Sequence, residues 1–486
     1  MKQKIILLAA FFTLNFLSLK AQFPTDVNYQ TISENVPAIP NLNVPYIDNS
    51  VPDPISMVRI TEFVPNWNWY PTHEYAKIQP WNADESVYKF YSVAIYDADT
   101  HQIIRQLPGS QIYPSYWSNT DADVLYGFQE DGSIISYSVA NDVVTSLDQI
   151  QGYEKVVLGP GEGNIDKYDH HVAFIGKAGT NMDVIVYDLQ NLQIAHTETF
   201  LGAWGNGTSE PQYVDWVSIS QSGDYVGIMW NHNNTSENNP FNGHFGVEIY
   251  NAIDMQFQRR IAAYGNHGDF GYAQNGDEVF VQFWGETGTV NMYYLDRMER
   301  VVLSNNTDFA GEGHISCRSL NRPGWAYVSQ DDTENTGVIV AIKLDNSGIV
   351  EYFGHHFSSS SSYLKSPMPC PNPNGDKIMF KTDYNQFQNT DEIYEVIAAK
   401  SANLNVLDTS FEGNFTCNNP VTDFLQIHSD SVEIKEIKLI NALGSVVKNR
   451  KNISNKEVKM DLSAIENGIY FLIINEQYTK KIVLYK

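Results

Sequence analysis

A loose internal repeat constrains the fold of this chain more than any other feature of its sequence. Each unit has a strand, a turn rich in Asn, Asp and Gly, a strand of aliphatic or aromatic residues, a polar loop and a last strand. The units recur at a spacing of about 40–50 residues, which is the period of β-propellers. They cover residues 78–97, 117–137, 171–188, 216–250, 269–296, 315–343 and 371–396. Helical periodicity is almost absent, whereas short apolar segments bounded by Gly-Asp turns are typical of sheet hairpins.

We therefore expect an all-β chain in which residues 55–400 form a seven-bladed β-propeller, followed by a small C-terminal β-sandwich. The segment 51–60 is expected to supply the strand that closes the ring. A β-helix and two stacked sandwiches are the alternatives that the same repeat allows.

The first 22 residues have the three parts of a secretory signal peptide. Lys2 and Lys4 make a basic start, residues 5–19 form an apolar run, and Ala21 is a small residue near the cleavage point. The run is shorter than the roughly 20 residues that a spanning helix needs. A cleaved signal is favoured over a signal anchor, and we expect no transmembrane segment in the mature protein.

Residues 411–486 carry strand-like segments in a fixed order. The segments are 419–427, which starts with Asn419-Pro420, 437–447 with Gly444, 461–474 with Asn467-Gly468, and the lysine-rich end 480–486. Their alternation of apolar and polar residues and their turn glycines predict a compact β-sandwich. In this order the motifs resemble the type A C-terminal sorting domain of the type IX secretion system. An ordinary C-terminal carbohydrate-binding or adhesive module is the alternative.

That resemblance implies the type IX secretion machinery as a partner, through residues 411–486, and a secreted or cell-surface protein exported across the outer membrane. The chain then has five predicted parts. They are a signal peptide (1–22), an N-terminal extension (23–54), the propeller (55–400), a linker (401–410) and the sorting domain (411–486).

Charge and cysteine content exclude two classes of protein. The net charge is −26, because 57 Asp and Glu outnumber 31 Lys and Arg. Such a field repels the phosphates of nucleic acids and anionic membranes, so no nucleic-acid partner is expected. Cys317, Cys370 and Cys417 can form at most one disulfide, which excludes a disulfide-stapled scaffold.

Histidines gather where the predicted blades begin. In a propeller the innermost strand of each sheet lines the central channel, so residues entering these strands converge at one face. Four predicted blades have a histidine at this place, although the whole chain has only 12. These are His73, His170, His267 and His314. We expect the functional site in this axial funnel.

One hypothesis for the funnel is a zinc or manganese site. His267, His314 and Cys317 are the candidate ligands, because imidazole and thiolate are ligand types of such metals. Two observations oppose it. The spacing of His314 and Cys317 on a strand points their side chains to opposite faces, and no zincin-type motif is present.

A second hypothesis is β-elimination at a uronic acid. This reaction needs a base, an acid for the leaving oxygen and a cation that neutralises the carboxylate. The candidate catalytic residues are His73, Tyr75, His170 and Arg318, and the candidate substrate-binding residues are Trp117, Trp216 and Lys365. Propellers with such sets of His, Tyr and Arg resemble the secreted ulvan and oligogalacturonate lyases. The resemblance implies an extracellular acidic polysaccharide as substrate.

Other functions stay open. Glu74, Asp169, Asp215 and Asp269 could serve a glycoside hydrolase, which needs two carboxylates. The Gly-rich segment 159–163 lacks the lysine of a phosphate-binding loop. A non-catalytic surface or matrix-binding propeller is the alternative to a lyase. The tryptophans that could then stack on sugars are Trp67, Trp69, Trp81, Trp117, Trp204 and Trp230, although packing between blades explains most of them.

Overall fold

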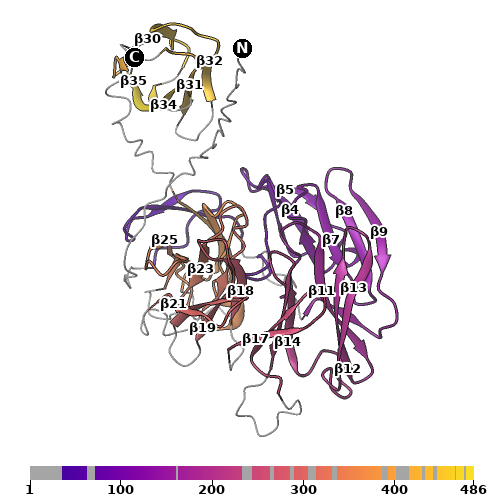
Figure 1. Cartoon of the computed structure of the whole chain (residues 1–486). Coiled ribbons are helices and arrows are strands. Elements are labelled where there is room, and N and C mark those ends of the chain that lie inside the picture. The colour runs from indigo at the N-terminus through magenta and orange to yellow at the C-terminus, as the bar shows by residue number, and fades with distance from the viewer. Residues whose placement is uncertain are drawn as a thin grey trace, which may run out of the picture. The chain divides into compact units, whose positions relative to one another are not determined.

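The computed structural model separates the chain into two units, Met1–Ser401 and Ala402–Lys486 (Figure 1). It describes residues 36–62, 72–159, 162–231, 243–262, 267–284, 289–304, 313–330, 337–385, 392–400, 415–429, 433–441, 446–465, 467–475 and 478–485. The predicted signal peptide and linker lie outside these residues. In the described part of the chain no helix is long and apolar enough to cross a membrane.

The described residues of the larger unit form seven antiparallel sheets, numbered here in chain order. Sheet 1 holds β3 (Val87–Phe90), β4 (Ala94–Asp97) and β5 (Ile103–Gln106); sheet 2 holds β6 (Ser115–Trp117), β7 (Val124–Phe128), β8 (Ser133–Ser138) and β9 (Val143–Gln149). Sheet 3 holds β10 (Val156–Val157), β11 (His171–Ala178), β12 (Asn181–Asp188) and β13 (Gln193–Phe200); sheet 4 holds β14 (Val214–Ile219), β15 (Tyr225–Trp230), β16 (Val247–Asn251) and β17 (Phe257–Ala262).

The later sheets repeat this pattern. Sheet 5 holds β18 (Gly268–Tyr272), β19 (Glu278–Trp284), β20 (Thr289–Tyr294) and β21 (Arg300–Val302); sheet 6 holds β22 (Ile315–Ser316), β23 (Trp325–Ser329), β24 (Val338–Lys343) and β25 (Val350–His355). Sheet 7 holds β26 (Cys370–Pro371), β27 (Lys377–Thr382), β28 (Tyr394–Lys400), β2 (Ile55–Arg59) and β1 (Tyr46–Asp48). Two single turns of 3-10 helix, η1 (Gly109–Gln111) and η3 (Tyr363–Lys365), lie in the connections.

Burial shows which strand of each sheet faces the interior. The first strands, such as β14 and β18, are almost wholly buried. The last strands, such as β9 and β13, are mostly exposed. Most of the sheets therefore run from an inner first strand to an outer last strand, as blades of a propeller do, whereas β25, the last strand of sheet 6, is buried throughout.

The hydrophobic cores lie between successive sheets. Separate clusters join sheets 1 and 2, sheets 2 and 3, sheets 3 and 4, and sheets 4 and 5, and a larger one joins sheets 5, 6 and 7. A further cluster packs Met379 and Ile397 of sheet 7 against Tyr88 and Phe90 of sheet 1. The sheets therefore form a closed ring, and the predicted all-β propeller is confirmed.

The ring closes through a strand from the N-terminal end of the described chain. Strand β2 pairs antiparallel with β28, and Met57 lies opposite Ala398. Its buried and half-buried residues alternate, and Met57 is fully buried in the shared core of sheets 5 to 7. The prediction that the segment 51–60 closes the ring is therefore correct.

The C-terminal unit is a two-sheet β-sandwich. One sheet holds β29 (Thr416–Cys417), β30 (Phe424–His428) and β33 (Glu457–Asp461); the other holds β32 (Val446–Arg450), β31 (Ile437–Asn441), β34 (Gly468–Ile474) and β35 (Tyr478–Leu484). Residues of both sheets, including Leu425, Ile427, Leu439 and Leu472, form one core. The predicted sandwich is confirmed.

Candidate functional site

Tyr75, His267 and His314 meet although they come from distant parts of the chain. The hydroxyl of Tyr75 lies 2.8 Å from Nδ1 of His267. The ring centroids of His267 and His314 are 4.3 Å apart, and the ring of Tyr75 meets that of His314 edge-on at 5.4 Å. His267 directly precedes β18 and His314 directly precedes β22, the inner strands of sheets 5 and 6. We call these three residues the Tyr–His cluster.

A close backbone approach positions His314. A Cβ atom on Gly313 would lie 1.9 Å from the carbonyl oxygen of Ser329, a distance that atoms do not reach. The N–H of His314 donates to the hydroxyl of Ser329 at 3.1 Å, and the carbonyl of His314 accepts from the N–H of Ser329 at 3.1 Å. Glycine before His314 therefore lets the chain enter β22 directly against β23.

Lys77 lies beside the cluster. Its Nζ is 2.7 Å from Oε2 of Glu162 and 4.4 Å from the ring centre of Trp216. The same atom is 5.7 Å from the ring centre of Tyr75. Because Lys77 is almost fully buried and Glu162 is mostly buried, removal of either partner would leave a charge with little access to water.

The Gly-rich segment 159–163 brings Glu162 to this position. A Cβ atom on Gly159 would lie 2.3 Å from the backbone nitrogen of Val217, and one on Gly163 would lie 2.6 Å from its carbonyl oxygen. Gly159 also has a φ of +33°, which disfavours other residues. These glycines therefore allow a close approach to β14 of the neighbouring sheet.

Tyr363, which belongs to η3, lies beside the Tyr–His cluster. Its ring centroid lies 5.8 Å from that of His314, and its hydroxyl is hydrogen-bonded to that of Tyr75. Fully buried Asp383 anchors this loop, since its Oδ2 accepts from Ser359 Oγ at 2.6 Å and from Lys365 Nζ at 2.8 Å. Lys365 is thus buried in an ion pair with Asp383, and its predicted role in substrate binding stays a prediction.

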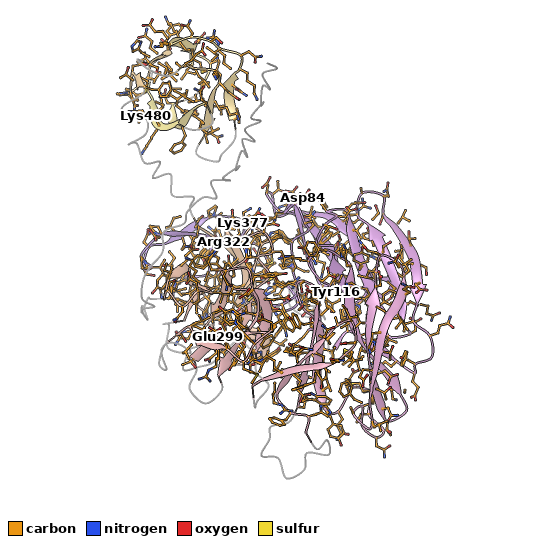
Figure 2. All side chains as sticks on the ribbon, viewed as in Figure 1. Asp84, Tyr116, Glu299, Arg322, Lys377 and Lys480 are labelled. Atoms are coloured by element: carbon orange, nitrogen blue, oxygen red, sulfur yellow. The ribbon has the colours of Figure 1, made fainter. Side chains whose placement is uncertain are left out.

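A cavity of about 210 Å³ adjoins the cluster. Its wall includes Glu74, Tyr75, Tyr91, Tyr113, Tyr116, Glu162 and Tyr363. Tyr116, which is labelled in Figure 2, comes from β6 of sheet 2. We call this cavity the tyrosine cup. The cup shares Tyr75 with the Tyr–His cluster, and it shares Glu162 and Tyr363 with the surroundings of the cluster.

The tyrosines of the cup keep their protons at neutral pH. Burial raises the pKa of Tyr75 well above its usual value, and the charge of Glu162 adds to this. Burial also raises the pKa values of Tyr91, Tyr113 and Tyr116, and the charge of Glu74 is the next cause for each. Their hydroxyls can therefore donate hydrogen bonds as well as accept them.

His73 is not accessible, so its position gives no support to the catalytic role predicted for it. The residue is fully buried, its Nδ1 lies 2.6 Å from Oε1 of Glu395, and its Nε2 lies 2.7 Å from the carbonyl oxygen of Met368. The prediction placed residues 73–75 together at the mouth of the channel. The structure directs Glu74 and Tyr75 to the cup and His73 into the interior.

His170 lies in the turn before β11, the second strand of sheet 3, and not at the channel mouth as predicted. Its N–H donates to Oδ1 of Asp166 at 3.2 Å, and its ring neighbours are Tyr168 and His171. The prediction took this segment as the entry to an inner strand. The inner strand of sheet 3 is β10 instead. Glu162 follows β10 in the chain and contacts Lys77.

Arg318 and Cys317 are buried below the cluster. Burial raises the pKa of the Cys317 thiol well above its usual value, and Asp269 adds to this, so the neutral thiol is favoured over the thiolate that a metal requires. Burial also raises the pKa of Asp269, against the opposing charge of nearby Arg318. Arg318 is buried, and its predicted catalytic role stays a prediction. Within the described ranges no group of three or more His, Cys, Asp or Glu side chains could hold a metal ion.

The predicted sugar-stacking tryptophans pack between sheets instead. Trp117 donates through Nε1 to the carbonyl oxygen of Pro80 at 2.8 Å, and Trp216 packs against Phe280 with ring centroids 5.8 Å apart. Trp81, Trp204 and Trp230 are also buried. Trp67 and Trp69 lie outside the described residues. The burial of Trp117 and Trp216 is explained by packing, and their predicted substrate-binding roles stay predictions.

The sequence did not indicate that Lys77, Glu162 and Tyr363 belong to the site. For Glu162 a signal was present, since Gly159 and Gly163 mark a close backbone approach. Tyr363 had no comparable local signal, because its position depends on Asp383, which follows β27.

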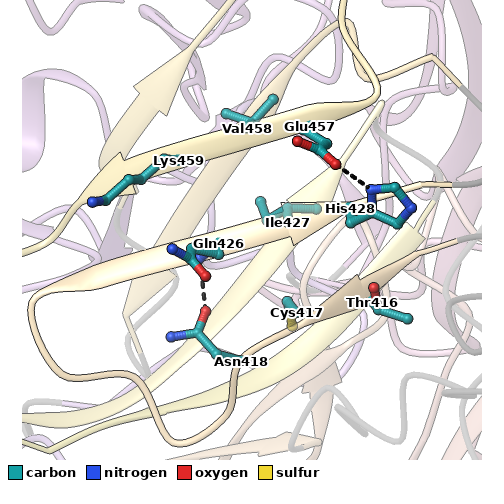
Figure 3. Close-up of a pocket in the computed structure, with 9 residues that line it drawn as sticks. All are labelled: Thr416, Cys417, Asn418, Gln426, Ile427, His428, Glu457, Val458 and Lys459. Atoms are coloured by element: carbon teal, nitrogen blue, oxygen red, sulfur yellow. Dashed lines mark hydrogen bonds and ion pairs between the residues drawn. The ribbon is translucent and has the colours of Figure 1, made fainter.

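A larger hollow of about 680 Å³ lies on the C-terminal unit, over the sheet of β29, β30 and β33 (Figure 3). Nδ1 of His428 lies 3.0 Å from Oε1 of Glu457 across β30 and β33. Both side chains are largely exposed, so this ion pair contributes little. The hollow is an open polar surface, whereas the cup is lined mainly by tyrosines.

Residues 419–485 match the family model described as the secretion system C-terminal sorting domain. The predicted type IX sorting domain is thereby confirmed. This domain indicates export across the outer membrane, to the cell surface or the exterior.

Solved structures resemble the propeller. An oligogalacturonate lyase in complex with manganese is 13% identical, with a TM-score of 0.51, covering 76% of this chain and 98% of that one. An oligogalacturonate lyase from Vibrio parahaemolyticus is 10% identical, with a TM-score of 0.49, covering 73% of this chain and 96% of that one. No curated protein matches the sequence. At such low identity the first likeness supports the fold alone.

Proposed function

We propose that the propeller binds an extracellular acidic polysaccharide at the Tyr–His cluster and cleaves it by β-elimination. The observation that carries this proposal is the distance of 2.8 Å between the Tyr75 hydroxyl and Nδ1 of His267. Histidine and tyrosine are the residue types that serve as base and acid in such a reaction. The structurally similar protein with a TM-score of 0.51 is named an oligogalacturonate lyase, which agrees with this chemistry.

The cluster can supply both proton transfers. A histidine of the cluster takes the proton from the carbon next to the carboxylate, and the electron pair forms a carbon–carbon double bond as the glycosidic C–O bond breaks. Tyr75 gives its proton to the leaving oxygen, since its raised pKa keeps the hydroxyl protonated at neutral pH. The proton held by the histidine restores Tyr75 through the contact between Nδ1 and the hydroxyl.

Lys77 is the cation that offsets the charge of the substrate carboxylate in the proposed mechanism. A lyase must offset the charge that develops on the uronic acid carboxylate. Nζ of Lys77 lies 5.7 Å from the ring centre of Tyr75, and Glu162 already holds it at 2.7 Å. The substrate carboxylate would share Lys77 with Glu162.

The proposed mechanism does not involve a metal ion. The similar lyase structure contains manganese. In this chain the predicted ligands His267 and His314 meet, but the third, Cys317, is a buried thiol whose raised pKa opposes the thiolate form. This donor set does not fit a bound zinc or manganese ion.

A non-catalytic glycan-binding propeller is the second candidate. The pairing of Lys77 favours it, because Nζ of Lys77 already lies 2.7 Å from Oε2 of Glu162. A paired cation neutralises a new carboxylate less well, whereas the tyrosine cup can still bind sugar hydroxyls.

Incubation of the purified chain with a panel of uronic-acid polysaccharides tests the proposal. We expect ultraviolet absorbance from unsaturated sugar ends to increase with time for the wild-type chain. We expect no such increase for a variant that lacks Tyr75. Retained glycan binding without such absorbance on any polymer of the panel would establish the binding function instead.

A further inference from the structure

We infer that the tyrosine cup binds a sugar unit that carries no anionic group, next to the acidic unit at the Tyr–His cluster. The inference rests on the proposed function and specifies its substrate. The polysaccharide is then a mixed polymer in which an acidic sugar adjoins a neutral or amino sugar, and not a homopolymer of uronic acid.

The shape of the cup suits one part of a chain that also contacts the cluster. The cup has a volume of about 210 Å³, and Tyr75 belongs to both the cup and the cluster. Tyr116 is almost fully buried, whereas Tyr113 is half exposed at the rim. Aromatic walls offer apolar surface to the carbon face of a sugar, and their hydroxyls offer polar contacts to its edge.

The carboxylates of the cup decide which sugar fits. Nζ of Lys89 holds Oε1 of Glu74, whereas Oε2 of Glu74 is buried and has no hydrogen-bond partner among the described residues. Such an oxygen costs free energy unless a ligand donates to it. A sugar hydroxyl or ammonium group can donate, but an ionised carboxylate cannot.

Nearby cations do not reverse this preference. Lys89 is held by Glu74, and Lys381, whose Nζ lies 3.3 Å from the backbone carbonyl oxygen of Glu74, is buried and does not line the cup. A uronic acid in the cup would therefore place its carboxylate near that of Glu74, whose cation Lys89 is already paired. Like charges in a partly buried site repel strongly, and the net charge of −26 adds to the effect.

Calorimetric titration of the full chain with short oligosaccharides tests the inference without depending on cleavage. Mixed oligosaccharides, which can place an acidic unit at the Tyr–His cluster and a neutral unit in the cup, are expected to bind more tightly than uronic acid oligomers of equal length. Tyr113→Ala should weaken the binding of neutral oligosaccharides about tenfold, because it removes an aromatic wall. Tyr168→Ala is the matched control, since Tyr113 and Tyr168 are each 50% exposed and Tyr168 does not line the cup. The control should leave the affinity unchanged.

Glu74→Gln removes the charge of Glu74 but keeps the size of its side chain, so it separates the effect of charge from the effect of shape. It should narrow the difference in affinity between mixed and uronic acid oligomers, and if this variant fails to fold, Tyr113→Ala decides alone. Equal or tighter binding of uronic acid oligomers by the wild-type chain, or no effect of Tyr113→Ala, would overturn the inference. Failure of the proposed function looks different: neutral oligosaccharides still bind in a manner that depends on Tyr113, but no polymer yields unsaturated ends.

Discussion

The hydroxyl of Tyr75 lies 2.8 Å from Nδ1 of His267, although 192 residues separate the two in the chain. Tyr75 precedes sheet 1, and His267 enters sheet 5. Only a closed ring of sheets brings such residues to one point, so the site and the ring depend on each other.

Tyr75→Phe should lower the rate of β-elimination by about 10²–10⁴-fold, the usual contribution of a general acid or base. The ring of Tyr75 packs in the core between sheets 2 and 3, and Phe preserves that packing. We therefore expect an unchanged melting temperature, and ultraviolet absorbance measures the rate. Tyr168→Phe, at a half-exposed tyrosine, is the control. An unchanged rate in Tyr75→Phe would exclude Tyr75 as the acid.

Lys77→Met should lower the free energy of unfolding of the propeller by about 3 kcal/mol, at the low end for a broken buried pair because Glu162 is partly exposed. Glu162 would lose its cation, and burial and Glu162 already raise the pKa of Asp215 nearby. The double variant Lys77→Met/Glu162→Gln should recover part of the loss. Denaturant unfolding measures both. A single variant as stable as the wild type would show that the ion pair contributes nothing.

His73→Gln should destabilise the propeller without changing glycan affinity in the folded protein. His73 is fully buried between Glu395 and the carbonyl of Met368, so substitution disturbs both hydrogen bonds. His170→Gln, at a half-buried position in a turn, should change neither property. Thermal unfolding and calorimetric titration are the measurements. Loss of glycan binding in a stably folded His73→Gln protein would restore the functional role predicted from the sequence.

Lys381 should make stability rise with pH above about 8. Burial lowers the pKa of Lys381 to about 8, whereas an unfolded lysine titrates near 10.4. Between these values the unfolded chain binds one more proton than the folded chain, so the free energy of unfolding increases with pH. Relative to Lys381→Met, the wild type should gain about 2 kcal/mol between pH 8 and about 9.5, at 1.36 kcal/mol per unit. Denaturant unfolding at both pH values tests this, and a constant difference between the two proteins would refute it.

Met57→Ala should lower the free energy of unfolding by about 2–5 kcal/mol, the cost of a cavity in a packed core. Met57 is fully buried in the core of sheets 5 to 7. Ser56→Ala, at a half-buried position on the other face of β2, is the control and should change little. Equal stabilities of the two variants in denaturant would show that β2 is not needed to hold the ring.

The sequence predicted the fold well because its signals are local. Period-two alternation and turn glycines predict strands and hairpins wherever they occur. The closing strand was also predictable, since the segment that contains Met57 alternates in the same way. The sorting domain was recognisable from motifs such as Asn467-Gly468, and residues 419–485 match its family model.

The site was less predictable because its geometry depends on packing between sheets. Tyr75, His267 and His314 were expected to converge, and the structure brings them into contact. Residue type alone could not indicate that Trp117 and Lys365 would be buried by neighbouring segments. Nor could spacing place Tyr363 or Glu162, whose positions depend on contacts with other sheets.

The pairing of β2 with β28 sets an order of events for export. Ile55 lies opposite Lys400, so a strand near the start of the propeller has its partner at the end of the propeller. Contacts across so many residues form slowly. The ring therefore cannot close until the chain as far as Lys400 is available, and the sorting domain at residues 419–485 follows this last strand. The export tag thus comes after every strand that the ring needs.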